Sequence, residues 1–117
     1  MKKLRCVTEM GMGVDVRGND HTKAAKRAVS DAIRHSSLGF FRLVGQQPQD
    51  MHIEVLIGVP SPETVDVAAV AAELPYGHIT VRVMAGGLAV PADGAGDPII
   101  IANAAVLVHL EVESPAG

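Results

Sequence analysis

The sequence predicts a single α+β domain of the α/β-sandwich type, with an open four-stranded sheet that carries two helices on one face. Two observations lead to this class. Residues 51–59 alternate between two faces with the period of a strand, whereas apolar positions after His21 recur with the period of a helix. Glycine and proline residues separate these segments into the order β-α-β-α-β-β, and no linker divides residues 1–117.

The first predicted strand covers residues 3–8, where Leu4 and Cys6 would lie on one face. It is expected to end at the pair Gly11 and Gly13, after which the chain turns through a polar loop. The glycines are therefore expected to belong to the loop.

The first predicted helix begins at His21. Asn19 or Asp20 is a suitable N-cap, because either side chain can accept a hydrogen bond from the first turn. Residues 36–39 are expected to end this helix, and residues 45–50 to form a connecting loop. Its apolar side consists of Ala25, Ala28, Val29, Ala32 and Ile33.

The second predicted strand, residues 51–59, is the clearest in the chain. Pro60 follows it, and Asp66 is suited to cap a short alanine-rich helix that reaches about Leu74. We expect this helix to share a face of the sheet with the first one, because both follow strands of the same sheet.

The remaining segments complete the sheet. Residues 79–84 predict a third strand, and residues 86–98 a mobile, hairpin-like loop. Residues 99–112 are long for one strand, so Asn103, which lies between small residues, is expected to mark a bulge or bend.

The second face of the sheet is predicted to be mixed. Leu56 and Leu107 would lie on it beside His52, Glu54 and His109. Such a partly apolar face is typical of a surface where subunits meet. Together with the small side chains available for the core, it predicts a homo-oligomer.

Composition and charge exclude several classes of protein. The 13 acidic and 10 basic residues give a net charge of -3, without the basic surplus that nucleic acid binding requires. The single Cys6 cannot form an intramolecular disulfide, the first residues lack the apolar segment of a signal peptide, and Asn103 and His109 interrupt the longest apolar run. We therefore expect a cytoplasmic protein without membrane contact, and no cofactor.

The functional centre is predicted in residues 9–23, where three glycines and six ionisable side chains lie between a strand and a helix start. Such glycines allow a ligand to approach main-chain amides, and a helix N-terminus favours negative charge. This favours a small polar or anionic ligand, and the alternative is a tight turn with solvated charges. The expected ligand contacts are Gly11, Gly13, Arg17, Gly18, Asp20 and His21, and the candidate catalytic residues are Lys23, Asp15 and Glu9.

Lys23 is expected on the first helical turn, where its positive charge opposes the helix dipole. This placement has two explanations. Lys23 faces an anionic ligand, or it is a solvated side chain that pairs with Asp20 or, through Arg27, with Asp31.

Neither of the two common phosphate-binding motifs is present. The Walker pattern requires Gly, Lys and Ser or Thr in succession, and the dinucleotide fingerprint requires a third glycine at a spacing that this segment does not have. Glu9, Asp15, Asp20 and His21 are possible metal ligands by type, but their spacing matches no coordination motif, so no metal is predicted.

The segment resembles a family of short conserved hypothetical proteins marked near the N-terminus by GxGxDxHG and a following TKAA-type helix. This chain has Arg17 where the family has His, which matters for any role that needs an imidazole there. The matching residues are Gly11, Gly13, Asp15, Gly18, Thr22, Lys23, Ala24 and Ala25, and the likeness continues through Gly58, Val59, Pro60, Val65, Asp66, Pro75, Tyr76, Gly77, Gly86, Gly87, Ala102, Asn103 and Ala104.

The same segment, with residues 81–90, is also similar to one repeat of the ring-opening amidohydrolases, which act on cyanuric acid and barbiturate. That resemblance implies three such domains around a threefold axis, and hence a homotrimer with sites at its interfaces. Ala85 stands where a repeat of that family would place its serine, and Val7 or its neighbour stands near the expected lysine. The resemblance therefore implies an assembly without the Ser-Lys dyad.

Three hypotheses follow for function. The first is an oligomer that binds a cyclic amide-like or anionic metabolite without chemistry. The second is a cyclic amide hydrolase-like enzyme, with Asp15 or Glu9 as general base and Arg17 and Lys23 as charge partners. The third is a structural interaction module, which explains the apolar strands but not the ionisable groups around the glycines.

Overall fold

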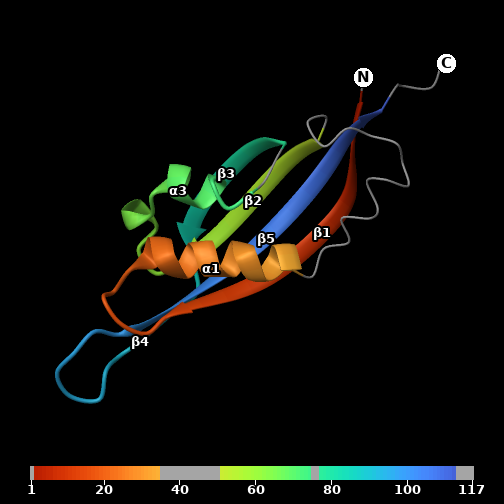
Figure 1. Cartoon of the computed structure of the whole chain (residues 1–117). Coiled ribbons are helices and arrows are strands. Elements are labelled where there is room, and N and C mark those ends of the chain that lie inside the picture. Colours follow the sequence, from red (N-terminus) through yellow and green to blue (C-terminus); the bar gives the residue numbers. More distant parts are fainter. Residues whose placement is uncertain (1, 35–50, 75–76, 113–117) are drawn as a thin grey trace.

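The chain forms a mixed α+β fold in which one five-stranded sheet carries both helices on one face (Figure 1). The computed structural model describes residues 2–34, 51–74 and 77–112. In chain order the elements are β1 (Lys2–Asp15), α1 (His21–Arg34), β2 (Met51–Val59), the 3-10 helix η2 (Pro62–Thr64), α3 (Val67–Ala71), β3 (His78–Ala85), β4 (Leu88–Val90) and β5 (Ile99–Val112).

The last strand occupies the middle of the sheet. The strand order is β1-β5-β2-β3, with β4 also paired to β5. β5 is antiparallel to β1, β2 and β4, while β2 and β3 are parallel. β1, β2 and β3 therefore run in one direction, and β5 runs against all three.

The core lies between the sheet and α1. Every second residue of β2 is buried from Met51 to Val59, which confirms the alternation expected for this strand. The helix contributes a narrow surface of small side chains, so α1 lies close to the sheet. Its buried residues are His21, Ala24, Ala25, Ala28, Val29 and Ala32.

The prediction that the first strand ends at its glycines is wrong, because β1 continues to Asp15. Gly11 and Gly13 lie inside the strand and face α1. A Cβ atom on Gly11 would lie 2.3 Å from the carbonyl oxygen of Ala28, and one on Gly13 would lie 2.1 Å from that of Ala24. Glycine is needed here because the backbones of strand and helix touch, not because the chain turns.

The prediction of a four-stranded sheet and of a loop over residues 86–98 also needs correction. Within that range, β4 pairs with β5 as a fifth strand. To reach β5, the chain crosses the end of β2, where the Gly86 amide donates to the Val59 carbonyl at 3.0 Å. Gly87 has a φ of 60°, and a Cβ atom there would lie 2.0 Å from the Ile101 carbonyl oxygen. The glycine pair thus allows a crossing that side chains would block.

The bulge predicted at Asn103 is not found, because Asn103 is in regular register with Met12 on one side and Gly58 on the other. The irregularity lies on the neighbouring strand, where the register shifts between Arg5 and Val7. β5 is thus paired in regular register with strands on both sides at Asn103.

Both predicted caps are confirmed. The Asp20 side chain accepts from the Lys23 amide at 3.0 Å, and the Asp66 side chain accepts from the Ala69 amide at 3.2 Å. The expected helix end at residues 36–39 and the loop at residues 45–50 lie outside the described residues.

The face of the sheet away from the helices is mixed, as predicted. It carries Leu56 and Leu107 together with His52, Glu54 and His109, which the register places in neighbouring rows. We call it the open face. Within the described part of the chain, none of the helices has the length and apolar character needed to cross a membrane.

We predict that Gly13→Ala lowers the free energy of unfolding by about 3 kcal/mol, or prevents folding, because the new methyl group would overlap the backbone of α1. Gly58→Ala is the control, since its Cβ would lie at an ordinary 3.4 Å from the nearest atom. Urea denaturation of both variants measures the difference, and equal stabilities would contradict the close contact between β1 and α1.

Candidate functional site

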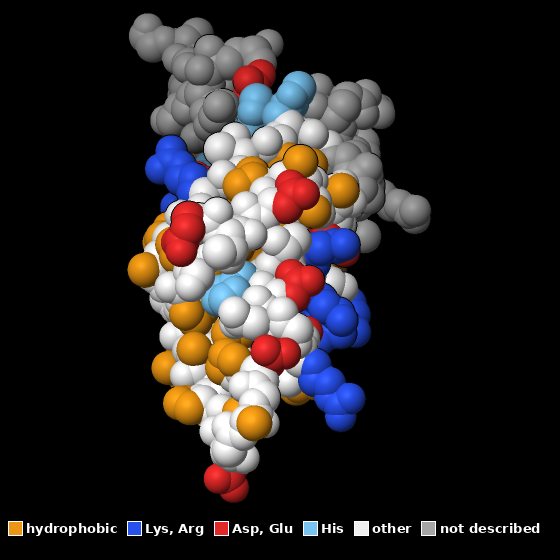
Figure 2. All heavy atoms as spheres, turned by 90° about the vertical axis from the view of Figure 1, so that its left-hand side faces the viewer, with side chains coloured by type: hydrophobic (Ala, Val, Ile, Leu, Met, Phe, Trp, Pro, Cys, Tyr) orange, Lys and Arg blue, Asp and Glu red, His pale blue; other side chains and the backbone are white. Residues whose placement is uncertain are grey.

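Many charged side chains lie on the helical side of the molecule. Figure 2 shows lysine and arginine side chains gathered along one side, with acidic groups between them, and hydrophobic side chains on the opposite side of the lower half. The polar surface of α1 supplies Lys23, Lys26, Arg27 and Arg34 to this region.

Asp15, the last residue of β1, is the buried charge from which the site is built. Its side chain is only 2% exposed, although it is an acid. One carboxylate oxygen accepts from the Asp20 amide at 3.0 Å. The other lies 3.9 Å from Lys23 Nζ and 3.8 Å from an Arg27 guanidinium nitrogen. A buried carboxylate is stable only with such partners, so Asp15 holds two cations at the start of α1.

The turn between β1 and α1 is fixed by hydrogen bonds. Gly18 and Asn19 both have positive φ, at 89° and 52°, which glycine and asparagine tolerate best. The Gly18 amide donates to an Asp97 carboxylate oxygen at 2.8 Å, which ties the turn to the connection between β4 and β5. The turn thereby places Asp20 as the cap of α1.

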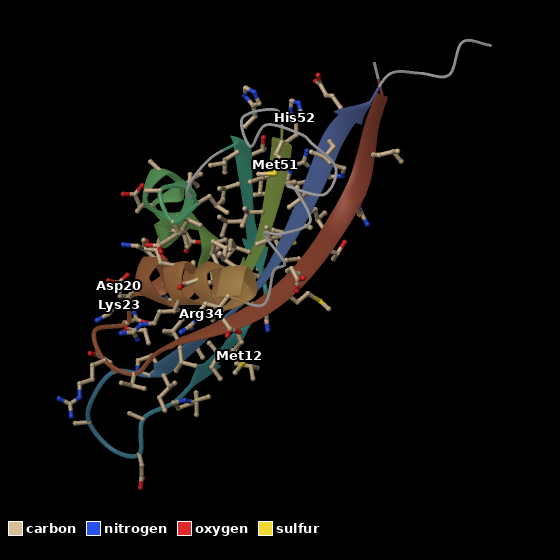
Figure 3. The ribbon with its side chains drawn as sticks, turned by 45° about the vertical axis from the view of Figure 1, so that its right-hand side comes forward. Met12, Asp20, Lys23, Arg34, Met51 and His52 are labelled. Carbon is tan, nitrogen blue, oxygen red and sulfur yellow. The ribbon has the colours of Figure 1, made fainter. Side chains whose placement is uncertain are left out.

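The position of Lys23 has an explanation that the sequence did not suggest. Its ammonium group pairs with Asp15 and not with the Asp20 side chain, which accepts from the Lys23 backbone amide instead. Figure 3 shows Asp20 and Lys23 together at the beginning of α1. The Arg27 guanidinium group also donates to the Val14 carbonyl at 2.6 Å, so both cations are anchored to the end of β1.

A cavity of about 490 Å³ lies beside these cations, between α1 and α3. On one side of this cavity, the Thr22 hydroxyl accepts a hydrogen bond from the Asp66 amide at 2.9 Å, which connects α1 to the segment before α3. Lys26 and Glu73 form an ion pair across it at 3.6 Å. The lining residues are Asp20, Thr22, Lys23, Lys26, Arg27, Ser30, Ala69 and Glu73. We call this cavity the α1–α3 groove.

His21 lies behind the groove and is 5% exposed. Its Nδ1 atom is 3.2 Å from the Asn19 carbonyl oxygen, an acceptor, so Nδ1 carries the proton and donates. Nε2 is buried and has no hydrogen-bond partner among the described residues. The His21 ring is not among the side chains that line the groove.

The structure divides the residues that the sequence assigned to the site. Asp15, Asp20 and Lys23 come together at the groove, whereas Gly11 and Gly13 lie under α1. Glu9 is on the helix-facing side of β1, and Arg17 and Gly18 are on the exposed turn. The functional roles of these residues stay predictions.

The sequence reasoning missed the groove residues on the second and third turns of α1 and on α3. Lys26, Arg27 and Ser30 follow Lys23 at helical spacing. That spacing was a signal for a common surface. Ala69 and Glu73 carried no such signal, because only the fold places α3 beside α1.

A second cavity, of about 480 Å³, lies on the open face at the ends of β2, β3 and β5. His52 and His78 stack there with ring centroids 5.0 Å apart, and His52 Nε2 is 2.9 Å from a Glu111 carboxylate oxygen. His109 lines the same cavity and neighbours His52 in the sheet. In the described ranges of the chain, no three such side chains are arranged to hold a metal ion.

We predict that Asp15→Ala lowers the free energy of unfolding by about 2–3 kcal/mol, because the buried carboxylate loses its charge-assisted hydrogen bond from the Asp20 amide and its ion pairs with Lys23 and Arg27. Asp15→Asn should lower the free energy of unfolding by about half as much, since its side-chain amide oxygen can still accept from the Asp20 backbone amide. Asp93→Ala, an exposed acid in the connection between β4 and β5, should change stability by less than about 0.5 kcal/mol. Thermal and urea unfolding test this order, and a neutral Asp15→Ala would contradict it.

Comparisons with known proteins give a family and similar solved structures. A family model described as "Conserved hypothetical protein (Lin0512_fam)" matches residues 5–108. The crystal structure of an FtsZ-like protein of unknown function from Nostoc punctiforme PCC 73102 is 41% identical, with a TM-score of 0.86. The match covers 96% of this chain and 99% of that chain. No curated protein matches the sequence. The chain therefore belongs to the family of conserved hypothetical proteins described as Lin0512_fam, which confirms the expected resemblance to a family of short conserved hypothetical proteins.

Proposed function

We propose that this protein binds a small anionic or cyclic amide-like metabolite in the α1–α3 groove. The observation that carries the proposal is the convergence of Lys23, Lys26 and Arg27 on one cavity of metabolite size. These three cations come from successive turns of one helix, so their backbone positions are fixed relative to one another.

The buried charge of Asp15 supports this role. The side chains of Lys23 and Arg27 are each about half exposed, at 53% and 49%. Both form ion pairs with the same Asp15 carboxylate oxygen, at 3.9 and 3.8 Å. An ammonium group has three donors and a guanidinium group five, so most of their donors remain available to a ligand. Asp15 therefore orients the cations without using up their hydrogen bonds.

The field of the helix adds to the attraction for an anion. The groove lies along the first turns of α1, where the backbone dipole is positive toward the N-terminus. Asp20 and Glu73 are on the rim, and Thr22 and Ser30 provide hydroxyl groups. This mixture favours a ligand that has negative charge or carbonyl groups together with N–H or O–H donors, as cyclic amides do.

Thermal unfolding in the presence of phosphate, citrate, cyanuric acid or barbiturate tests the proposal. At least one probe should stabilise the protein. Lys26→Gln should lower the affinity for that probe about tenfold or more, because a charge-assisted hydrogen bond to the probe is lost. Arg34→Gln is the matched control: Arg34 is on the same helix, 74% exposed, and outside the groove lining. It should leave the affinity unchanged.

Two results would contradict binding without chemistry. If no probe stabilises the protein at millimolar concentration, the groove is not a site for this class of ligand. If the absorbance of cyanuric acid or barbiturate falls during incubation with the wild-type protein and not with Lys23→Gln, the protein is an enzyme. Stabilisation without turnover supports the proposed function.

A further inference from the structure

The open face of the sheet carries an apolar surface that the groove does not use. The register aligns Met12, Asn103, Gly58 and Met84 in one row across β1, β5, β2 and β3. The next row consists of Met10, Ala105, Leu56 and Arg82. Met10, Met12 and Met84 thus stand on the two edge strands, and the central strands carry the small residues Gly58 and Ala105 beside Leu56 and Asn103.

The methionines at the two edges of these rows are exposed. Met10 and Met12 are 72% and 55% exposed on β1, and Met84 is 46% exposed on β3. Between them, Gly58 has no side chain and Ala105 has only a methyl group. Figure 3 shows Met12 projecting from β1 away from α1, on the side that the helices leave uncovered.

We propose that a second copy of this chain packs against the open face. The methionines of one copy pack against the small residues Gly58 and Ala105 of the other, because methionine is long, unbranched and adaptable. The same surface supplies both the methionines and the small residues, which is the requirement for a self-complementary contact.

The charges on the open face support a second copy over a charged partner. Arg82 lies 3.9 Å from Glu54, and His52 is hydrogen-bonded to Glu111. Each of these charged groups thus has its partner in the same chain. Two such faces meet without repulsion, whereas a strongly acidic or basic protein finds no compensating charge on this surface.

The size of the face also fits a stable association. At about 3.3 Å per residue and about 4.8 Å between strands, β1, β5, β2 and β3 present a surface on the order of 700 Å². A standard protein interface buries about 800 Å² on each partner. On this mixed face, Met10, Met12 and Met84 are 46% to 72% exposed, so their apolar surface is available to a partner.

Sedimentation velocity and light scattering test the proposal on the whole chain. The wild-type protein should be a dimer or larger at micromolar concentration. Met12→Glu should weaken the association at least a hundredfold, because it places a charge in an apolar contact. Met84→Lys, on the opposite edge strand, should do the same and replaces Met12→Glu if that variant fails to fold by circular dichroism.

Val67→Glu is the matched control, because Val67 is an apolar residue 44% exposed on α3, in the helical layer. It should leave the assembly intact. A monomeric wild-type protein would overturn the proposal, as would an oligomer that survives both methionine substitutions or one that Val67→Glu dissociates. Ligand affinity in the α1–α3 groove is measured separately, so the two proposals fail or succeed independently.

Discussion

The contact between the backbones of β1 and α1 determines the rest of this structure. Gly11 and Gly13 remove two side chains from the strand, and α1 presents alanine at the places that they face. The helix therefore lies directly on the strand. This contact fixes the height and direction of α1, and with them the positions of Lys23, Lys26 and Arg27 above the buried carboxylate of Asp15. The position of the groove therefore depends on the position of α1.

Much of the fold could be predicted from the sequence. The bounds of β2 and β5 and the caps of both helices follow from alternation, proline and aspartate, because these signals act locally. The end of β1 and the whole of β4 could not be predicted. A glycine that allows a helix to approach and a glycine that allows a turn look the same in one sequence, and the partner that distinguishes them is distant along the chain.

The site shows the same division between local and distant signals. The density of charge around Asp15, Asp20 and Lys23 indicated where the chain would gather polar groups, and the structure does bring these three together. The contribution of α3 depends on tertiary packing, and no pattern near Glu73 indicates it. The partner of Lys23 was also missed, because Asp15 was expected in a polar loop and not at the buried end of a strand.

The central position of β5 affects how the chain folds. β2 can pair with β3 on one edge, but β1 and the other edge of β2 have no partner strand until β5, which follows all the other elements, inserts between them. The sheet therefore depends on contacts between segments far apart in sequence, such as Lys2 with Val112. Loops that must close over such distances slow folding. During synthesis, β1 and β2 must wait with unsatisfied edges until the final strand emerges, so the apolar residues of this sheet are exposed longest in the newly made chain.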